Sequence, residues 1–217
     1  MPVGSSGSAI AFLSGGIDSP VATFMGIKRG LKVTAVHFHA VPKTNPASIE
    51  KVKELVKKLE KYQKNIKLIL IPIIELHTEI KNNCDERLRL VLLRRAMLKI
   101  GEKIANREFG KKTYTFITGD SLAQVASQTL ENLSVINSAT DRLIIRPLIG
   151  WDKSEIMDKA KDIDTYDISI RPHDDACSLF VPKNPETKAR LEYTEKEEEK
   201  YNFEKVIKSI DYLTNES

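Results

Sequence analysis

The chain has 217 residues, 41% hydrophobic and 29% charged, and its 34 basic and 30 acidic residues give a net charge of +4. Such values are typical of one large soluble globular domain. No segment approaches the roughly 18 apolar residues that a membrane-spanning helix needs. Two cysteines exclude a disulfide-rich scaffold and a four-cysteine zinc site. Because no signal peptide is evident, we expect a cytoplasmic protein without membrane contact.

The net charge is unevenly distributed along the chain. Residues 186–217 hold nine acidic and six basic residues, so residues 1–185 carry all of the positive excess. A basic body accommodates a polyanion such as a nucleotide or RNA, but a lysine-rich surface that meets only solvent explains the charge equally well. We interpret residues 1–7 as a flexible linker remnant, and residues 186–217 as a charged C-terminal extension, peripheral and either helical or partly disordered.

Short apolar segments alternate with helical patterns between these ends. The predicted strands are, in chain order, 9–13, 33–38, 66–74, 113–117 and 143–148, the last of them broken by a proline. The predicted helices are 19–30, 47–64, 85–108 and 152–161, with Asp152 as an N-cap. This alternation predicts an α/β fold, with an open, mostly parallel, Rossmann-like sheet of about five strands and helices on both faces.

The segment LSGGIDSP at residues 13–20 indicates anion binding. It follows the first predicted strand and begins the first predicted helix. Its glycines allow backbone N–H groups to approach an anion, and the helix N-terminus directs unpaired N–H groups at it. Asp18 suits a Mg²⁺ ion that bridges to a phosphate. The lysine of a Walker loop and the spacing of a dinucleotide loop are both missing, and an ordinary glycine-rich turn is the alternative.

The loop SGGIDS at residues 14–19 resembles the pyrophosphate loop of the ATP pyrophosphatase (PP-loop) superfamily, whose members cleave ATP between its α- and β-phosphates. Further segments resemble, in the same order, the catalytic domain of the tRNA 4-thiouridine synthetase (tRNA sulfurtransferase) family. They are 20–22, 35–39, 94–97, TGDSLAQVASQT at 118–129, 145–149 with 152–153, and ISIRP at 168–172. We therefore assign residues 8–185 to a PP-loop domain.

This resemblance implies an ATP-dependent reaction on tRNA. The enzyme adenylates O4 of the uridine at position 8, sulfur replaces the oxygen to give 4-thiouridine, and AMP and pyrophosphate leave. The implied cofactors are ATP and Mg²⁺. The implied partners are tRNA and a sulfur donor, either free sulfide or a persulfide carrier such as a cysteine desulfurase, and a homodimer is expected. A link to sulfur supply for the thiamine thiazole also follows from the family. Members carry an N-terminal THUMP region, so we expect a truncated or stand-alone catalytic domain.

The resemblance also assigns residues. For ATP it implies the six loop-side positions Phe12, Leu13, Ser14, Gly15, Gly16 and Ser19, together with Asp18, His37, Phe38, Arg94, Gly119 and Gln128. Asp18 would also hold Mg²⁺, Lys153 would be required for activity, and Cys177 would be the catalytic cysteine. From the residues alone, Arg94, Lys153 and Gln128 are equally consistent with a solvated surface, and His37 with a core histidine.

The sequence surroundings of Cys177 and Cys84 lead to different expectations for the two thiols. Cys177 lies among turn-forming residues, where Asp174 and Asp175 would raise its pKa and nearby basic groups would lower it. Cys84 is either a partner of Cys177 in a redox pair or a structural residue. A three-cysteine iron–sulfur site within one chain is not expected, because the chain has two cysteines and no C-x-x-C.

Two other functions remain open at this point. A different PP-loop ligase would use ammonia as its nucleophile and would not need Cys177. A catalytically silent nucleotide- or RNA-binding module would bind ATP without cleaving it.

Overall fold

The computed structural model describes residues 1–43, 45–110, 112–172 and 181–208. Its centre is a five-stranded sheet in the order β3-β2-β1-β4-β5, with every pairing parallel. The strands are β1 (Ser8–Phe12), β2 (Lys32–His39), β3 (Leu68–Pro72), β4 (Tyr114–Ile117) and β5 (Ile144–Ile145). The predicted parallel α/β sheet is therefore confirmed, with a last strand shorter than expected.

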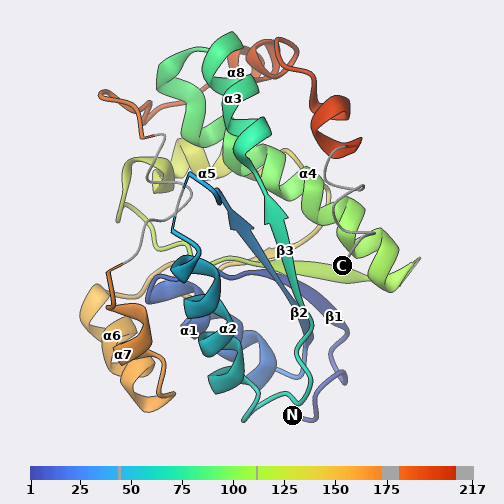
Figure 1. The fold of residues 1–217 in the computed structure, drawn as a ribbon, viewed down its shortest axis with the longest axis vertical. Helices are drawn as coiled ribbons and strands as arrows, with labels where there is room; N and C mark the ends of the chain where they lie inside the picture. The colour runs from blue at the N-terminus through green and yellow to red at the C-terminus, as the bar shows by residue number, and fades with distance from the viewer. Residues whose placement is uncertain (44, 111, 173–180, 209–217) are drawn as a thin grey trace.

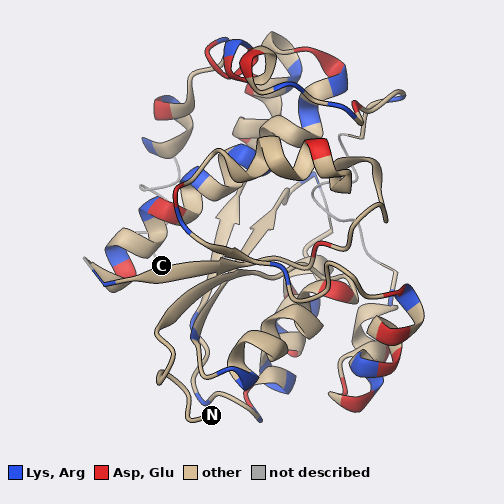
Figure 2. Cartoon of the chain, turned by 180° about the vertical axis from the view of Figure 1, so that it is seen from behind, with Lys and Arg blue, Asp and Glu red and all other residues tan. Residues whose placement is uncertain are grey.

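Helices cover both faces of this sheet (Figure 1). One face carries α1 (Asp18–Lys28), α2 (Ala47–Leu59), α6 (Lys153–Asp162) and α7 (Tyr166–Ser169). The other carries α3 (Ile74–Asn83), α4 (Arg89–Phe109) and α5 (Leu130–Asn137), and α8 (Leu191–Glu198) packs against α4. Because the sheet lies between two layers, its strands are apolar on both sides. Ala9, Ile10 and Ala11 of β1 are fully buried, and Figure 2 shows charged residues mainly on helices and loops.

Three helices were not predicted from the sequence: α3, α5 and α7. The predicted strand 66–74 was too long, since β3 ends at Pro72 and α3 begins at Ile74. Ile73, Leu76 and Ile80 are buried at helical spacing, and the preceding apolar residues of β3 hide this change of period. The predicted helix 47–64 also ends early, at Leu59.

The segment predicted as a peripheral extension contributes to the core in the part that is described. Residues Tyr201, Val206 and Ile207 are at most 5% exposed and belong to the same apolar cluster as α3, α4 and α5. Glu198 accepts hydrogen bonds from Arg95 at 3.0 and 2.9 Å and from Lys99 at 2.9 Å. Burial disfavours ionisation of Glu198, but these cationic donors outweigh it and lower its pKa.

The connections of the sheet reverse direction between β1 and β4. From β1 the chain continues to β2 on one side, whereas β4 is followed by β5 on the other. In open α/β sheets, ligands bind at such a switch point, outside the carboxyl ends of the strands. Two loops lie there, residues 13–17 after β1 and residues 118–129 after β4. Within the described ranges, no helix is both long and apolar enough to cross a bilayer.

Candidate active site

A cavity of about 340 Å³ opens at this switch point. It is lined by both loops, by the ends of β1 and β2 and by one side of α4. Its volume falls within the usual range for sites that bind small molecules or cofactors. Nearly all of the residues that the sequence assigned to ATP line it: Phe12, Leu13, Ser14, Gly16, Asp18, Ser19, His37, Phe38, Arg94, Gly119 and Gln128. Gly15 is buried within the first loop.

Two serines close the loop of residues 14–19. The backbone N–H of Ser14 donates to Oγ of Ser19 at 2.8 Å, and the two hydroxyl oxygens are 3.1 Å apart. The backbone N–H of Gly16 donates to Oγ of Ser14 at 3.3 Å. These short-range bonds hold the loop against the start of α1, whose N-cap residue Ile17 makes no side-chain cap. The first N–H groups of α1 therefore remain available to an anion.

Lys153 and Asp18 meet although they are far apart in the sequence. Lys153 is the first residue of α6 and Asp18 the first of α1. Lys153 Nζ lies 2.6 Å from Asp18 Oδ1, with 44% and 24% of the two side chains exposed. Asp18 lines the cavity, so this ion pair places a cation at the end of the cavity that the loop of residues 14–19 forms.

Gly119 allows the loop after β4 to approach α1. A Cβ atom at this position would lie 2.9 Å from the backbone nitrogen of Ser19 and 3.0 Å from the carbonyl carbon of Asp18. These contacts are with backbone, which has little freedom to move. A residue without a side chain is therefore required for the two loops to face each other across the cavity.

Aromatic side chains line the part of the cavity next to β2. The rings of Phe12 and Phe38 pack edge to face, with centroids 5.5 Å apart. His37 is 5% exposed, and its Nδ1 lies 2.9 Å from the carbonyl oxygen of Leu13. This hydrogen bond fixes the ring beside the loop after β1, so His37 is a buried residue that also lines the cavity.

Asp120 organises the opposite wall, and sequence reasoning did not identify it. Its carboxylate is 2% exposed. It accepts hydrogen bonds from Thr118 Oγ1 at 2.7 Å, Gln128 Nε2 at 3.4 Å and Arg146 Nε at 3.2 Å, and it forms an ion pair with Arg94. Burial opposes ionisation of Asp120, but the charge and hydrogen bonds of Arg94 and the bond from Thr118 outweigh it, and the pKa is lowered.

Two polar atoms of this wall lack a hydrogen-bond partner within the described part of the chain. They are Gln128 Oε1 and Arg146 Nη2, and both are buried. The ionised Asp120 accepts but does not donate, so it holds the nitrogen of Gln128 and turns Oε1 away. Arg146 is fixed by Asp120 and by Asn137 Oδ1 at 3.2 Å. A buried acceptor and a buried donor are thus held on residues that line the cavity.

Arg146 and Asp120 were missed because their signal is tertiary. Both lie in segments that the sequence analysis noted, at 118–129 and 145–149, but neither pattern says which side chains turn inward. The described residues contain no cluster of three or more His, Cys, Asp or Glu that would hold a metal by protein ligands alone.

The structure describes one of the two cysteines, Cys84. Cys177 lies outside the described ranges, in 173–180, so its predicted role and its pairing with Cys84 are not tested. Cys84 follows α3 and donates to the carbonyl oxygen of Glu197 at 3.3 Å. Burial and the nearby carboxylate of Glu197 raise the pKa of Cys84 to about 11. A thiol with this pKa is protonated at neutral pH and a poor nucleophile.

Comparisons with known proteins agree with this geometry. The chain is 47% identical over 211 residues to a "Probable tRNA sulfurtransferase" of Caldanaerobacter subterraneus subsp. tengcongensis, covering 97% of this chain and 55% of the relative. A protein of the same name from Moorella thermoacetica is 47% identical over 199 residues, covering 90% and 50%. The chain therefore spans about half the length of these curated relatives.

Solved structures show the same relation. A 4-thiouridine synthetase in complex with RNA and with bound ATP is 41% identical, with a TM-score of 0.83 over 99% of this chain and 54% of that one. The NMN synthetase of Francisella tularensis, with 18% identity and a TM-score of 0.54, shares the fold alone. The family model described as "Thiamine biosynthesis protein (ThiI)" matches residues 4–203. The resemblance expected from the sequence is thus confirmed, and the chain belongs to the ThiI family.

Proposed function

We propose that the chain is the adenylating domain of a tRNA sulfurtransferase. ATP binds in the cavity at the switch point, and O4 of a tRNA uridine attacks the α-phosphate and expels pyrophosphate. A sulfur nucleophile then adds to C4 of the uracil and expels AMP, which leaves 4-thiouridine. The observation that supports this most is one cavity lined both by the serine-closed loop and by the Asp120 wall. Its support from outside the chain is the similarity to the synthetase that contains RNA and ATP.

The triphosphate is proposed to lie at the start of α1. Backbone N–H groups there point at the anion, and Lys153 adds positive charge 2.6 Å from Asp18. Charge that develops on the leaving pyrophosphate is stabilised by such fixed donors and cations. On this assignment Lys153 and the loop orient the phosphates, while Arg94 and Arg146 contribute positive charge from the facing wall.

Asp18 fits a Mg²⁺ ion that bridges to phosphate. Its carboxylate is a hard oxygen ligand, it lines the cavity, and 24% of the side chain is exposed, which leaves room for water ligands. Mg²⁺ in nucleotide sites commonly uses one or two carboxylates together with phosphates and water. When bound, the ion would neutralise charge on the pyrophosphate.

The sulfur-transfer half of the reaction is proposed from the sequence. Sulfide would react directly with C4, or Cys177 would carry the sulfur as a persulfide. In the persulfide route the outer sulfur bonds to C4 as AMP leaves, and an external thiol reductant then cleaves the remaining S–S bond to release 4-thiouridine. A sulfur donor, a homodimeric state, a cytoplasmic location and a contribution to thiamine biosynthesis are further proposals that accompany family membership. Cys84 is not assigned a part in sulfur transfer, because its thiol is protonated and bonded to the backbone of Glu197.

One reaction tests this proposal. The chain is incubated with unmodified tRNA, ATP, Mg²⁺ and sulfide, the RNA is digested, and 4-thiouridine and AMP are measured by mass spectrometry. We expect both products, in equal amounts. AMP without 4-thiouridine would support adenylation but contradict sulfur transfer. AMP formation that depends on ammonia and persists in Cys177→Ser would identify another PP-loop ligase. ATP binding without either product would support a silent module.

A further inference from the structure

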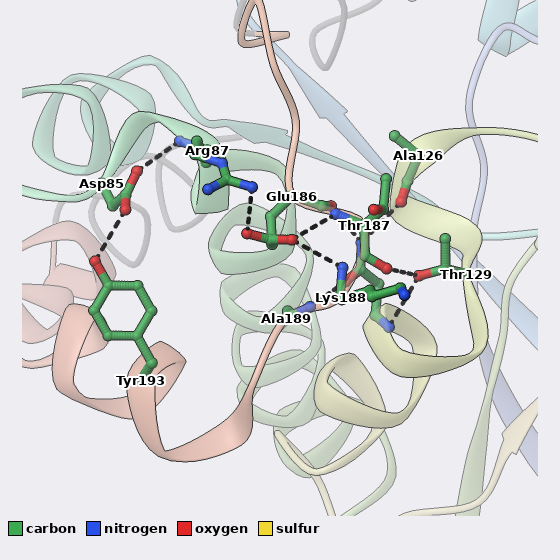
Figure 3. A network of polar contacts seen from close by, with 10 residues as sticks. Asp85, Arg87, Ala126, Thr129, Glu186, Thr187, Lys188, Ala189 and Tyr193 are labelled. Carbon is green, nitrogen blue, oxygen red and sulfur yellow. Dashed lines mark hydrogen bonds and ion pairs between the residues drawn. The ribbon is translucent and has the colours of Figure 1, made fainter.

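The segment of residues 186–189 binds to the back of the loop that carries Ser127 and Gln128. The side-chain amide of Asn132, in α5, connects them and is fully buried. Its Nδ2 donates to the carbonyl oxygen of Ala126 at 2.8 Å and to that of Glu186 at 2.7 Å, and its Oδ1 accepts from the backbone N–H of Ala189 at 3.0 Å. Figure 3 shows the segment that carries Glu186 and Ala189 lying beside the turn that carries Ala126 and Thr129. One amide thus joins the loop after β4 to a segment more than fifty residues later in the sequence.

A second hydrogen bond ties the other end of this turn to the 186–189 segment. Thr129 Oγ1 donates to the carbonyl oxygen of Thr187 at 2.7 Å. Ala126 and Thr129 bracket the two residues between them, Ser127 and Gln128, which line the cavity. Ser127 Oγ lies 3.4 Å from Arg94, and Gln128 Nε2 lies 3.4 Å from Asp120. The position of both side chains therefore depends on where the 186–189 segment holds the ends of this turn.

The 186–189 segment is itself fixed by Glu186. The carboxylate of Glu186 accepts from the backbone N–H groups of Thr187 and Lys188, both at 3.0 Å, and pairs with Arg87 at 2.9 Å. The backbone N–H of Glu186 donates to the carbonyl oxygen of Arg87 at 3.0 Å. None of these groups lines the cavity, so their effect on it is indirect.

We infer that Asn132 and Glu186 are positioning residues of the ATP cavity, which act by fixing the turn that presents Ser127 and Gln128. This rests on the proposed binding of ATP there. It follows that residues 186–189 belong to the nucleotide-binding unit and are not an appended segment. Loss of either residue loosens the turn, weakens ATP binding and raises KM for ATP, while kcat at saturating ATP stays close to that of the wild type.

The test measures the dissociation constant of ATP and the melting temperature for variants of the full chain. We expect Asn132→Ala to weaken ATP binding about tenfold and Glu186→Ala about threefold. Glu186→Gln keeps an oxygen that accepts the two backbone N–H groups, so we expect it to restore most of the affinity. Tyr193→Phe is the matched control, because Tyr193 bonds to Asp85 at 2.9 Å in the same network but does not touch the turn. It should leave ATP affinity unchanged.

ATP affinity within twofold of the wild type in folded Asn132→Ala and Glu186→Ala would overturn the inference. If Asn132→Ala does not fold, Glu186→Ala against Glu186→Gln decides it. Hydrogen exchange without nucleotide separates this inference from the proposed function. The backbone N–H of Ala123, which donates to the carbonyl oxygen of Gln128 at 2.9 Å, should exchange faster in Glu186→Ala than in the wild type or in Tyr193→Phe. Unchanged exchange contradicts the positioning role whether or not the wild type binds ATP.

Discussion

The two walls of the cavity are built in different ways. The wall formed by the loop of residues 14–19 is built mainly from local bonds, since Ser14 and Ser19 bond to each other within one turn of chain. From more distant elements, Lys153 pairs with Asp18, and Ser169 donates to the carbonyl oxygen of Gly16 at 3.3 Å. The Asp120 wall is assembled from several elements, with Arg94 in α4 and Arg146 after β5 both paired to one buried carboxylate. The first wall leaves N–H groups available to an anion. In the second wall, both arginines are already paired with the carboxylate of Asp120. On the proposed function, the first wall would bind the phosphates of ATP and the second would orient the rest of the ligand.

We expect the largest effect on AMP formation from a substitution at Asp18, in the wall formed by the loop of residues 14–19. Asp18→Ala removes the carboxylate proposed to hold Mg²⁺ and to orient Lys153. We expect AMP formation to fall at least about 100-fold, the scale of losing a group that stabilises transition-state charge, while the melting temperature changes little. Asp158→Ala, in an exposed ion pair on α6, is the control. Intact AMP formation in Asp18→Ala would show that the carboxylate has no catalytic part.

Asp120→Asn tests the other wall and should affect stability as well as binding. It removes the negative partner of two partly buried arginines, and breaking such a group costs about 3 kcal/mol of unfolding free energy. We expect a clear loss in chemical denaturation and weaker ATP binding. Asp164→Asn breaks an exposed ion pair with Lys61 and should leave the denaturation midpoint unchanged. Equal denaturation midpoints for Asp120→Asn and Asp164→Asn would show that the buried carboxylate of Asp120 does not stabilise the fold.

Acid denaturation also tests whether the buried carboxylate of Asp120 stabilises the fold. The folded-state pKa of Asp120 is lowered, so its stabilising contribution is fully present above its unfolded pKa of about 4 and is lost as pH falls through the folded value. The wild type should therefore lose stability more steeply below about pH 4 than Asp120→Asn. Parallel stability–pH curves for the two proteins would show that this carboxylate is not linked to folding.

Gly119→Ala tests the approach of the two walls to each other. The added methyl group would meet the backbone of Asp18 and Ser19 at 2.9 to 3.0 Å. We expect about tenfold weaker ATP binding and a loss of about 1 to 3 kcal/mol in unfolding free energy. Gly150→Ala has nothing within 4 Å of the new methyl group and is the control. Unchanged ATP titration for Gly119→Ala would mean that the loops need not lie this close.

The smallest effect is expected at Cys84, which belongs to neither wall. Its pKa of about 11 keeps the thiol protonated at neutral pH. Cys84→Ser should form 4-thiouridine within about twofold of the wild-type rate, and alkylation of Cys84 by iodoacetamide should be slow at pH 7. Cys177→Ser should instead lose sulfur transfer from a persulfide donor. A Cys84→Ser protein without thiolation activity would assign Cys84 a direct role.

The sequence predicted the local wall well and the assembled wall poorly. Ser14, Asp18 and Ser19 share one short motif, so their types and spacing were enough to place them. Arg94, Gly119 and Gln128 were assigned through family resemblance, because nothing local distinguishes them from surface residues. Asp120 and Arg146 stayed unassigned, since their roles depend on contacts between β4, β5 and α4.

For the fold, the sequence likewise predicted the strands better than the helices. All five strands were placed within three residues at each end, because buried parallel strands are continuous apolar segments. The prediction for β3 overran into α3, where helical spacing starts directly after the strand. The helix α5 is short and its first residue, Leu130, is 71% exposed, so its apolar pattern is weak. The boundary placed after residue 185 stays a prediction.

The most direct test of the two-wall account is a crystal structure of the chain with Mg²⁺ and an α,β-methylene analogue of ATP. The account predicts phosphate oxygens at the N-terminus of α1, beside Asp18 and Lys153, and ligand atoms within hydrogen-bond distance of Gln128 Oε1 and Arg146 Nη2. Phosphates bound elsewhere, with both of those atoms still without a partner, would contradict it.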